Sequence, residues 1–350
     1  MENPKENSQI LALSEDSAIE YLRARGLVDA ETQCSTEPAG DGNINWVRRI
    51  QANDGRSWII KQAREQLEKF PQYRADTRRI LVEAAWLQQA ASVDHDACCP
   101  EIIDFDPDLR VLVLEDLGLC PRLDEELLTE RNLAAPLETI GGLLGRLHRK
   151  TANDPSLAAT FRSTNMRELH FAHIFELPFS ENDFPLPEPV RERARGLYED
   201  GALQEEIQAL HQKCCTEQEA LVHADPQPGN ILLPGDRVKL LDAEIAHLGC
   251  AALDPGIVLA HLALGAIALR NDSLLGRRAE PFWESYQADA GEIADWETTV
   301  RIAGVEMLRR TIGAARVAAV GEVAASLTAI ETGCAWLLHP APAIARLDIR

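Results

Sequence analysis

The 350-residue chain lacks the features that mark several common protein classes. No window approaches ~18 uninterrupted apolar residues, so we expect no membrane-spanning helix. The opening stretch MENPKENSQ has neither the basic nor the apolar region of a secretory signal peptide. Internal repeats and long low-complexity segments are also absent. These absences lead us to expect a cytoplasmic globular protein.

Positive charge is scarce, because 35 Lys and Arg face 56 Asp and Glu, for a net charge of -21. Nucleic acids and anionic membranes both require a basic face, so neither is expected as a partner. A local basic pocket for a nucleotide is compatible with this balance. The eight cysteines form no C-x-x-C motif, and no His cluster has zinc-ligand spacing. We therefore expect free thiols in a reducing compartment.

The densest functional pattern is VHADPQPGNILLPGDRVKLLDAE, residues 222–244. Asp225 opens a turn-rich loop that Asn230 closes; a short apolar strand, a turn and a return strand follow, and the return strand leads to Asp242 and Glu244. Such a hairpin can bring these oxygen donors to one edge. Hard oxygen ligands suit Mg²⁺, and Mg²⁺ suits a nucleotide phosphate. The hypothesis is therefore phosphoryl transfer.

A second pattern lies nearer the N-terminus, where a Gly-rich turn precedes two predicted strands joined by a hairpin turn. Lys61 lies on the second strand, SWIIKQ at 57–62. Either feature alone is ordinary, because β-turns and exposed strand lysines are common. Together they suit a nucleotide: the backbone N–H groups of the turn can approach phosphate oxygens, and the lysine can reach the same phosphates. The turn residues are Gly40, Asp41, Gly42 and Asn43.

A helix is predicted over 74–91, with an apolar stripe at every third or fourth residue. Glu83 lies within it and would alone be read as a solvated residue. In the protein-kinase arrangement, a helix glutamate pairs with the strand lysine and holds it toward the nucleotide. Glu83 is the best-placed candidate for such a pair with Lys61.

A lobe boundary is predicted after the buried strand LRVLVL at 109–114. We expect a small β-rich nucleotide-binding lobe over 1–117 and a larger helical catalytic and substrate-binding lobe over 118–350. In a kinase, the backbone at Glu115 and Leu117 would be the natural adenine contact.

Helices dominate the expected second lobe, although residues 151–200 contain many prolines and read as irregular. Three glycines in the helix expected over 133–150 would allow close packing. His148, near the end of that helix, is read as a structural residue. After Pro255 we expect four helices, over about 256–270, 279–288, 292–316 and 319–337.

These parts together resemble the aminoglycoside phosphotransferase–choline kinase superfamily. HAD at 223–225 and PGN at 228–230 are similar to its H-G-D-x-x-x-x-N catalytic loop. Within that superfamily, the resemblance is closer to methylthioribose kinases. It is carried by GDGNINWV, WIIKQA, the D-x-E motif at 242–244 with AHLGCAALDPG after it, and MLRRTIGAARVA with Arg309 and Arg310.

The resemblance implies an α+β, bilobal, protein kinase-like fold and an ATP-dependent, Mg²⁺-dependent kinase of a small-molecule sugar, with a homodimer suggested. Methylthioribose kinases phosphorylate the 1-hydroxyl of 5-methylthioribose in methionine salvage. By carry-over, Asp225 orients or deprotonates the sugar hydroxyl, and Arg309 and Arg310 contact sugar or transferring phosphate. Asp242 and Glu244 hold Mg²⁺, with Asn230 as a further candidate, and ATP phosphates contact Lys61.

The chain departs from the family pattern near the catalytic loop, at Ala224 in place of Gly, at Pro226-Gln227 and at Asn230. It also lacks the expected tryptophan-containing loop after Lys61. A related pentose such as 5-deoxyribose therefore fits nearly as well. Two alternatives stay open: a phosphotransferase for an aminoglycoside or amino alcohol, and a nucleotide-binding scaffold without turnover. For Arg310, a simpler reading is a solvated i,i+4 salt bridge with Glu306.

Overall fold

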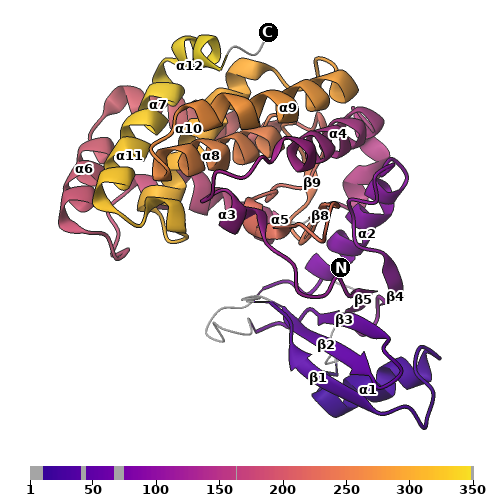
Figure 1. Cartoon of the computed structure of the whole chain (residues 1–350). Coiled ribbons are helices and arrows are strands. Elements are labelled where there is room, and N and C mark those ends of the chain that lie inside the picture. Colours follow the sequence, from indigo (N-terminus) through magenta and orange to yellow (C-terminus); the bar gives the residue numbers. More distant parts are fainter. Residues whose placement is uncertain (1–10, 41–44, 67–74, 163, 348–350) are drawn as a thin grey trace, which may run out of the picture. The chain divides into compact units, whose positions relative to one another are not determined.

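The computed structural model describes residues 11–40, 45–66, 75–162 and 164–347. The chain forms two compact units, one from residues 1–87 and 100–118 and the other from 88–99 and 119–350 (Figure 1). The first contains a five-stranded sheet and the second is mainly helical, which confirms the expected α+β fold class. No helix within the described ranges is both long and apolar enough to cross a membrane.

The sheet of the first unit is antiparallel throughout, with strand order β1-β2-β3-β5-β4. Its central strand β3 carries Lys61, which lies opposite Val47 on β2 and Leu112 on β5. Central placement keeps this lysine backbone fixed by a hydrogen-bonded neighbour on each side. The strands are β1 (Cys34–Pro38), β2 (Trp46–Ala52), β3 (Ser57–Gln62), β4 (Ile102–Asp106) and β5 (Val111–Glu115).

Helix α1 (Glu15–Ala24) begins after Ser14, whose hydroxyl accepts the N–H of Ser17 as a helix cap. Its Leu22 is buried in the same core as Trp46 and Ile60 of the sheet. Helix α2 (Arg79–Ala91) begins later than expected, because the Asp76 carboxylate accepts the N–H of Arg78 in a turn before it.

The second unit is built around α8, which is buried from Leu253 through Ala266. Helices α4 and α9 approach closely at glycine, as expected: a Cβ on Gly141 would lie 2.2 Å from the carbonyl oxygen of Phe282. The principal helices are α3 (Leu123–Glu126), α4 (Ala134–Thr151), α7 (Gly201–Thr216), α8 (Leu253–Ala268), α9 (Ser273–Ala290), α10 (Trp296–Ile312), α11 (Val323–Leu338) and α12 (Pro340–Arg346), with short 3₁₀ turns at Pro155–Ala159, Leu177–Phe179, Pro228–Asn230 and Ala318–Val320.

The expectation that residues 151–200 are irregular is wrong. This segment contains α5 (Thr164–Phe171), a π turn (Ala172–Glu176) and α6 (Glu188–Tyr198). Prolines concealed the pattern, but Pro189 lies in the first turn of α6, where its missing N–H costs no helical hydrogen bond. Val190, Ala194 and Leu197 then form the buried stripe of α6.

Two short antiparallel strand pairs organise the stretch 222–244, one at its ends and one within it. Strand β6 (Ala220–Val222) pairs with β9 (His247–Gly249), and β7 (Ile231–Leu232) pairs with β8 (Lys239–Leu240). The second pair confirms the predicted hairpin, whose turn contains Gly235 at φ 65°. All eight cysteines carry free thiols, as expected.

Candidate active site

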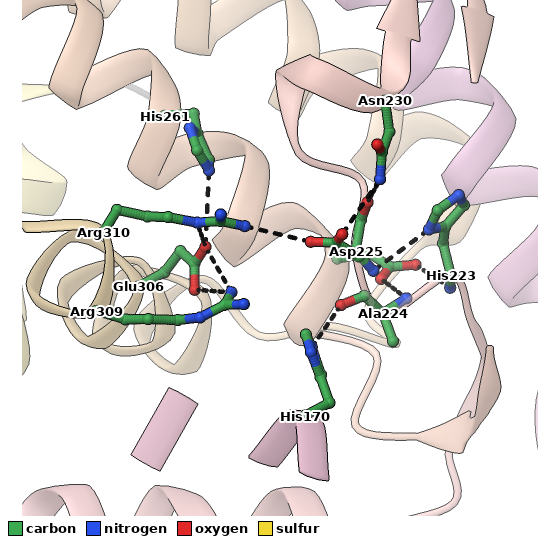
Figure 2. Close-up of polar contacts among 10 residues, drawn as sticks. His170, His223, Ala224, Asp225, Asn230, His261, Glu306, Arg309 and Arg310 are labelled. Atoms are coloured by element: carbon green, nitrogen blue, oxygen red, sulfur yellow. Dashed lines mark hydrogen bonds and ion pairs between the residues drawn. The ribbon is translucent and has the colours of Figure 1, made fainter. Parts of the chain in front are cut away.

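Asp225 lies in the loop that leaves β6, and a buried carboxylate holds the backbone of the two residues before it. Asp254, at the start of α8, accepts the N–H of His223 at 2.7 Å and that of Ala224 at 2.8 Å. Asn230 closes the loop: its side-chain amide donates to the Asp225 carbonyl at 2.9 Å and to the Asp225 carboxylate at 3.2 Å. Figure 2 shows the Asn230 amide directed toward Asp225.

Ala224 takes a left-handed backbone conformation, with φ 71°. For a residue with a Cβ this conformation costs roughly 1–2 kcal/mol. Hydrogen bonds on both sides of the residue hold it there: Asp254 accepts its N–H, and His170 of α5 reaches its carbonyl oxygen at 3.0 Å. The loop before Asp225 is therefore fixed by groups from two other elements.

Asp254 is itself supported by His148, whose Nε2 lies 3.1 Å from the Asp254 carboxylate and whose Nδ1 lies 2.8 Å from the Tyr286 hydroxyl. Burial raises the pKa of Asp254, but hydrogen bonds and neighbouring histidines outweigh burial and hold the pKa below its ordinary value. Asp254 is therefore an ionised acceptor for the loop N–H groups. His148 is completely buried, which confirms its structural reading.

Arg309 and Arg310, near the end of α10, share one buried carboxylate. Glu306 accepts from Arg309 Nη1 with both oxygens, at 3.0 and 2.9 Å, and from Arg310 Nε at 2.6 Å. Arg310 Nη2 then donates to Asp225 Oδ1 at 3.3 Å (Figure 2). The Glu306 side chain is 1% exposed, so the simpler reading of a solvated salt bridge with Arg310 is wrong.

The charge state of this cluster follows from its contacts. Burial raises the pKa of Glu306, but the two guanidinium groups outweigh burial and hold it well below its usual range. His261 Nε2 lies 3.6 Å from Glu306, and burial lowers the pKa of His261. Glu306 is therefore an ionised carboxylate shared by two guanidinium groups, and Arg310 makes a second contact with Asp225.

Asp242 follows β8 in a left-handed conformation, at φ 65°, and Glu244 is buried. The ligand atoms of Glu217, Glu219 and Cys250 lie within 4.8 Å of one another, close enough to share a metal ion. Within the described ranges, Asp225, Asp242 and Glu244 form no such group. A Mg²⁺ site does not require such a group, because Mg²⁺ usually takes one or two carboxylates and completes its shell with water and substrate phosphate. The side chains of Asn230, Asp242 and Glu244 offer the hard oxygen donors that Mg²⁺ prefers. Their roles as metal ligands stay predictions.

In the first unit, the structure pairs the predicted lysine and glutamate. Lys61 Nζ lies 2.8 Å from Glu83 Oε1, and the two side chains are 6% and 2% exposed. Glu83 is therefore an ion-pair partner rather than the solvated residue that its sequence position alone would indicate. Gly40 has φ 67°, and Asp41, Gly42 and Asn43 fall outside the described ranges.

The predicted adenine-contact segment follows β5. Glu115 ends that strand opposite Trp58, and its carboxylate accepts the N–H of Glu101 at 3.0 Å. Leu117, two residues further along the chain, is half-buried. Asp116 between them binds Arg49 at 2.8 Å, a contact that the sequence did not indicate. The nucleotide roles of Glu115 and Leu117 stay predictions.

Sequence reasoning missed three groups around Asp225: Asp254, His170 and the bridging role of Glu306. The i,i+3 and i,i+4 spacing of Glu306 with the arginines was a usable signal. Asp254 lies in the segment ALDPG, where the family resemblance could have drawn attention to it. His170 had no signal, because its partner is a backbone carbonyl 54 residues away.

The buried histidines predict acid sensitivity. Burial lowers the pKa of His247 from its ordinary 6.5 to about 4. Between these values the unfolded chain binds a proton that the folded chain does not, so the free energy of unfolding should fall as pH drops from about 6.5 to about 4. This one group accounts for about 3 kcal/mol. Urea unfolding across that range should show the fall, and His247→Phe should flatten it by close to one proton; an unchanged slope would contradict the assignment.

Comparison with known proteins adds the family. The pattern described as "Phosphotransferase enzyme family" matches residues 35–298. A methylthioribose kinase from Bacillus cereus is 28% identical, with 89% of this chain and 87% of the relative covered. One from Exiguobacterium sibiricum is 26% identical, with 91% and 90% covered.

Two solved structures share the fold at low sequence identity. A choline kinase from Cryptosporidium parvum has a TM-score of 0.51 and 12% identity, with 95% of this chain and 97% of that chain covered. A choline/ethanolamine kinase family protein from Mesorhizobium loti has a TM-score of 0.50 and 17% identity, with 95% and 98% covered. Since the family pattern spans most of the sequence and both structures have the expected kinase-like fold, the chain belongs to the phosphotransferase enzyme family.

Proposed function

We propose that the protein is an ATP-dependent, Mg²⁺-dependent kinase that phosphorylates a hydroxyl of a neutral sugar. The proposed acceptor is the 1-hydroxyl of 5-methylthioribose, or of a related pentose such as 5-deoxyribose. The observation that carries the proposal is the buried ion-pair chain from Glu306 through Arg310 to Asp225. The names and coverage of the curated relatives support the choice of sugar.

Asp225 is the proposed catalytic residue. Its carboxylate would accept a hydrogen bond from the acceptor hydroxyl, orient that oxygen toward the γ-phosphorus and take up its proton as transfer proceeds. Asn230 and Arg310 hold the carboxylate from two sides, at 3.2 and 3.3 Å, which reduces the number of orientations it can adopt.

The nucleotide is assigned to the first lobe, which we take as residues 1–117, and the acceptor to the second, residues 118–350. Lys61, held by Glu83, would donate to the ATP phosphates, and the turn at 40–43 would offer backbone N–H groups to them. Glu115 and Leu117 would present backbone groups to adenine. Asp242 and Glu244, with Asn230, would hold Mg²⁺, which neutralises charge on the phosphates when bound.

A neutral acceptor fits the charges around Asp225 better than a cationic one. Arg310 already contacts the Asp225 carboxylate, and Arg309 lies beside it on α10, joined to the same glutamate. Arg310 therefore occupies the carboxylate that an ammonium group of an aminoglycoside or amino alcohol would otherwise bind, which favours a neutral acceptor. A scaffold without turnover is disfavoured, because the Lys61–Glu83 pair and the Asp225–Asn230 loop are both intact.

The proposal is tested by measuring ADP release from Mg-ATP with 5-methylthioribose, 5-deoxyribose, ribose, choline and an aminoglycoside. We expect release with a pentose, and at least about 10-fold lower kcat/KM with the cationic acceptors, equivalent to 1.4 kcal/mol. Absence of release with every pentose would contradict the sugar-kinase assignment, and faster release with choline would reverse the choice of acceptor. A homodimer and a cytoplasmic location stay predictions.

A further inference from the structure

We propose that His170 is a positioning residue for Asp225, which it orients by holding the carbonyl of Ala224 in a strained backbone conformation. His170 belongs to α5, in the segment whose sequence suggested no functional residue. The inference rests on the proposed role of Asp225 in transfer, but the contact itself can be tested separately.

The contact is at the peptide that joins Ala224 to Asp225. His170 Nε2 lies 3.0 Å from the Ala224 carbonyl oxygen. Because a carbonyl oxygen only accepts hydrogen bonds, Nε2 must carry the proton and donate it. Figure 2 shows the imidazole directed at this oxygen from the side of the loop opposite Asn230. Rotation of this peptide would move Asp225, so the hydrogen bond bears directly on the direction of the carboxylate.

The backbone strain at Ala224 makes the hydrogen bond from His170 important for the loop conformation. With φ 71°, Ala224 occupies a region that residues with a Cβ avoid and glycine adopts freely. Asp254 fixes the N–H side of the residue at 2.8 Å, and His170 fixes the carbonyl side. If the bond on the carbonyl side were lost, the peptide could turn toward a relaxed conformation. A glycine at position 224 would have no such tendency.

The surroundings of His170 bury it and keep it uncharged. It is buried, and burial, followed by the nearby Arg309, holds its pKa well below the ordinary value. The next residue, Phe171, packs edge-on against His247 with ring centroids 5.5 Å apart. His247 lies opposite Val222 in the β6–β9 ladder, and the loop leaves that ladder directly after Val222. Helix α5 and the loop are thus anchored on the same two strands.

The test removes the donor while preserving the bulk of the side chain. His170→Leu should lower kcat for the accepted pentose by about 10-fold, because a small misdirection of the reacting group is costly, and leave the KM for ATP unchanged. His170→Gln, whose amide can still donate to the carbonyl, should keep most of the activity. Equal losses for Leu and Gln would count against a role for the hydrogen bond.

A second variant separates positioning from packing. In an Ala224→Gly background the left-handed conformation needs no support, so His170→Leu should cost less than about 3-fold in kcat there. A residue that acts only by filling space would cost the same in both backgrounds, and that result would overturn the proposal.

The tautomer of His170 gives a readout that does not depend on turnover. ¹⁵N NMR of the imidazole in the full chain should show Nε2 protonated, and His170→Gln serves to assign the signal. Protonation at Nδ1 would overturn the positioning proposal even in an active enzyme. Conversely, if no acceptor were phosphorylated while the Nε2–H tautomer was found, the proposed function would fail and the contact would stand.

Discussion

Replacing Asp225 with asparagine should lower kcat for phosphate transfer by about 10³-fold while ATP affinity changes little. Asparagine keeps the size of the side chain and can still accept the hydrogen bond from Asn230, now 3.2 Å from the carboxylate. It cannot take up the acceptor proton, and it removes the negative charge that Arg310 contacts. The rate is measured by ADP release with the accepted pentose, and ATP affinity by titration calorimetry.

Asp236→Asn is the matched control, because Asp236 is an exposed aspartate in the turn of the neighbouring β7–β8 hairpin. This variant should retain full activity. If Asp225→Asn kept kcat within about 3-fold, Asp225 would not be the group that accepts the proton. An equal loss of ATP affinity and kcat would instead assign Asp225 to nucleotide binding.

Replacing Glu306 with glutamine should reduce the free energy of unfolding by about 3–5 kcal/mol. Glu306 is 1% exposed and is the shared partner of two guanidinium groups, at 2.9 and 2.6 Å. Glutamine nearly preserves the volume but leaves two buried positive charges against Asp225 alone. Since domains of ordinary stability have about 5–15 kcal/mol in total, a loss of this size should be plain in urea denaturation.

Glu297→Gln is the control on the same helix. Glu297 is 60% exposed and pairs with Arg301 at i,i+4, so its loss should cost under about 1 kcal/mol. If both variants lost the same small amount, the arginines would have found other partners and Glu306 would not be the centre of the cluster. Glu306→Gln should also lower kcat, because Arg310 loses the carboxylate charge that holds its Nε.

The sequence predicted features that follow from a local pattern or from the order of elements along the chain. The hairpin after Asn230 follows from apolar residues on both sides of a Pro-Gly-Asp turn. The pairing of Lys61 with Glu83 was foreseen because strand, helix and residue types occur in the order that a kinase-like lobe requires.

What the sequence could not predict depends on contacts between distant segments. Asp254 and His170 both act on backbone atoms of the loop, and backbone partners leave no trace in side-chain patterns. A solvated Glu306–Arg310 salt bridge stayed open as an alternative, because their spacing is the same on a buried helix as on an exposed one. Helix α6 was missed because its prolines masked the apolar stripe that packs it.

The central claim is that this chain transfers the γ-phosphate of ATP to a hydroxyl of a neutral pentose through Asp225. The most direct measurement is ³¹P NMR of a reaction containing Mg-ATP, 5-methylthioribose or 5-deoxyribose, and the wild-type protein or Asp225→Asn. The account predicts that the γ-phosphate signal is replaced by a sugar-phosphate ester coupled to the anomeric proton, in the wild-type reaction only. Release of inorganic phosphate without an ester, or an equal ester yield from both proteins, would contradict it.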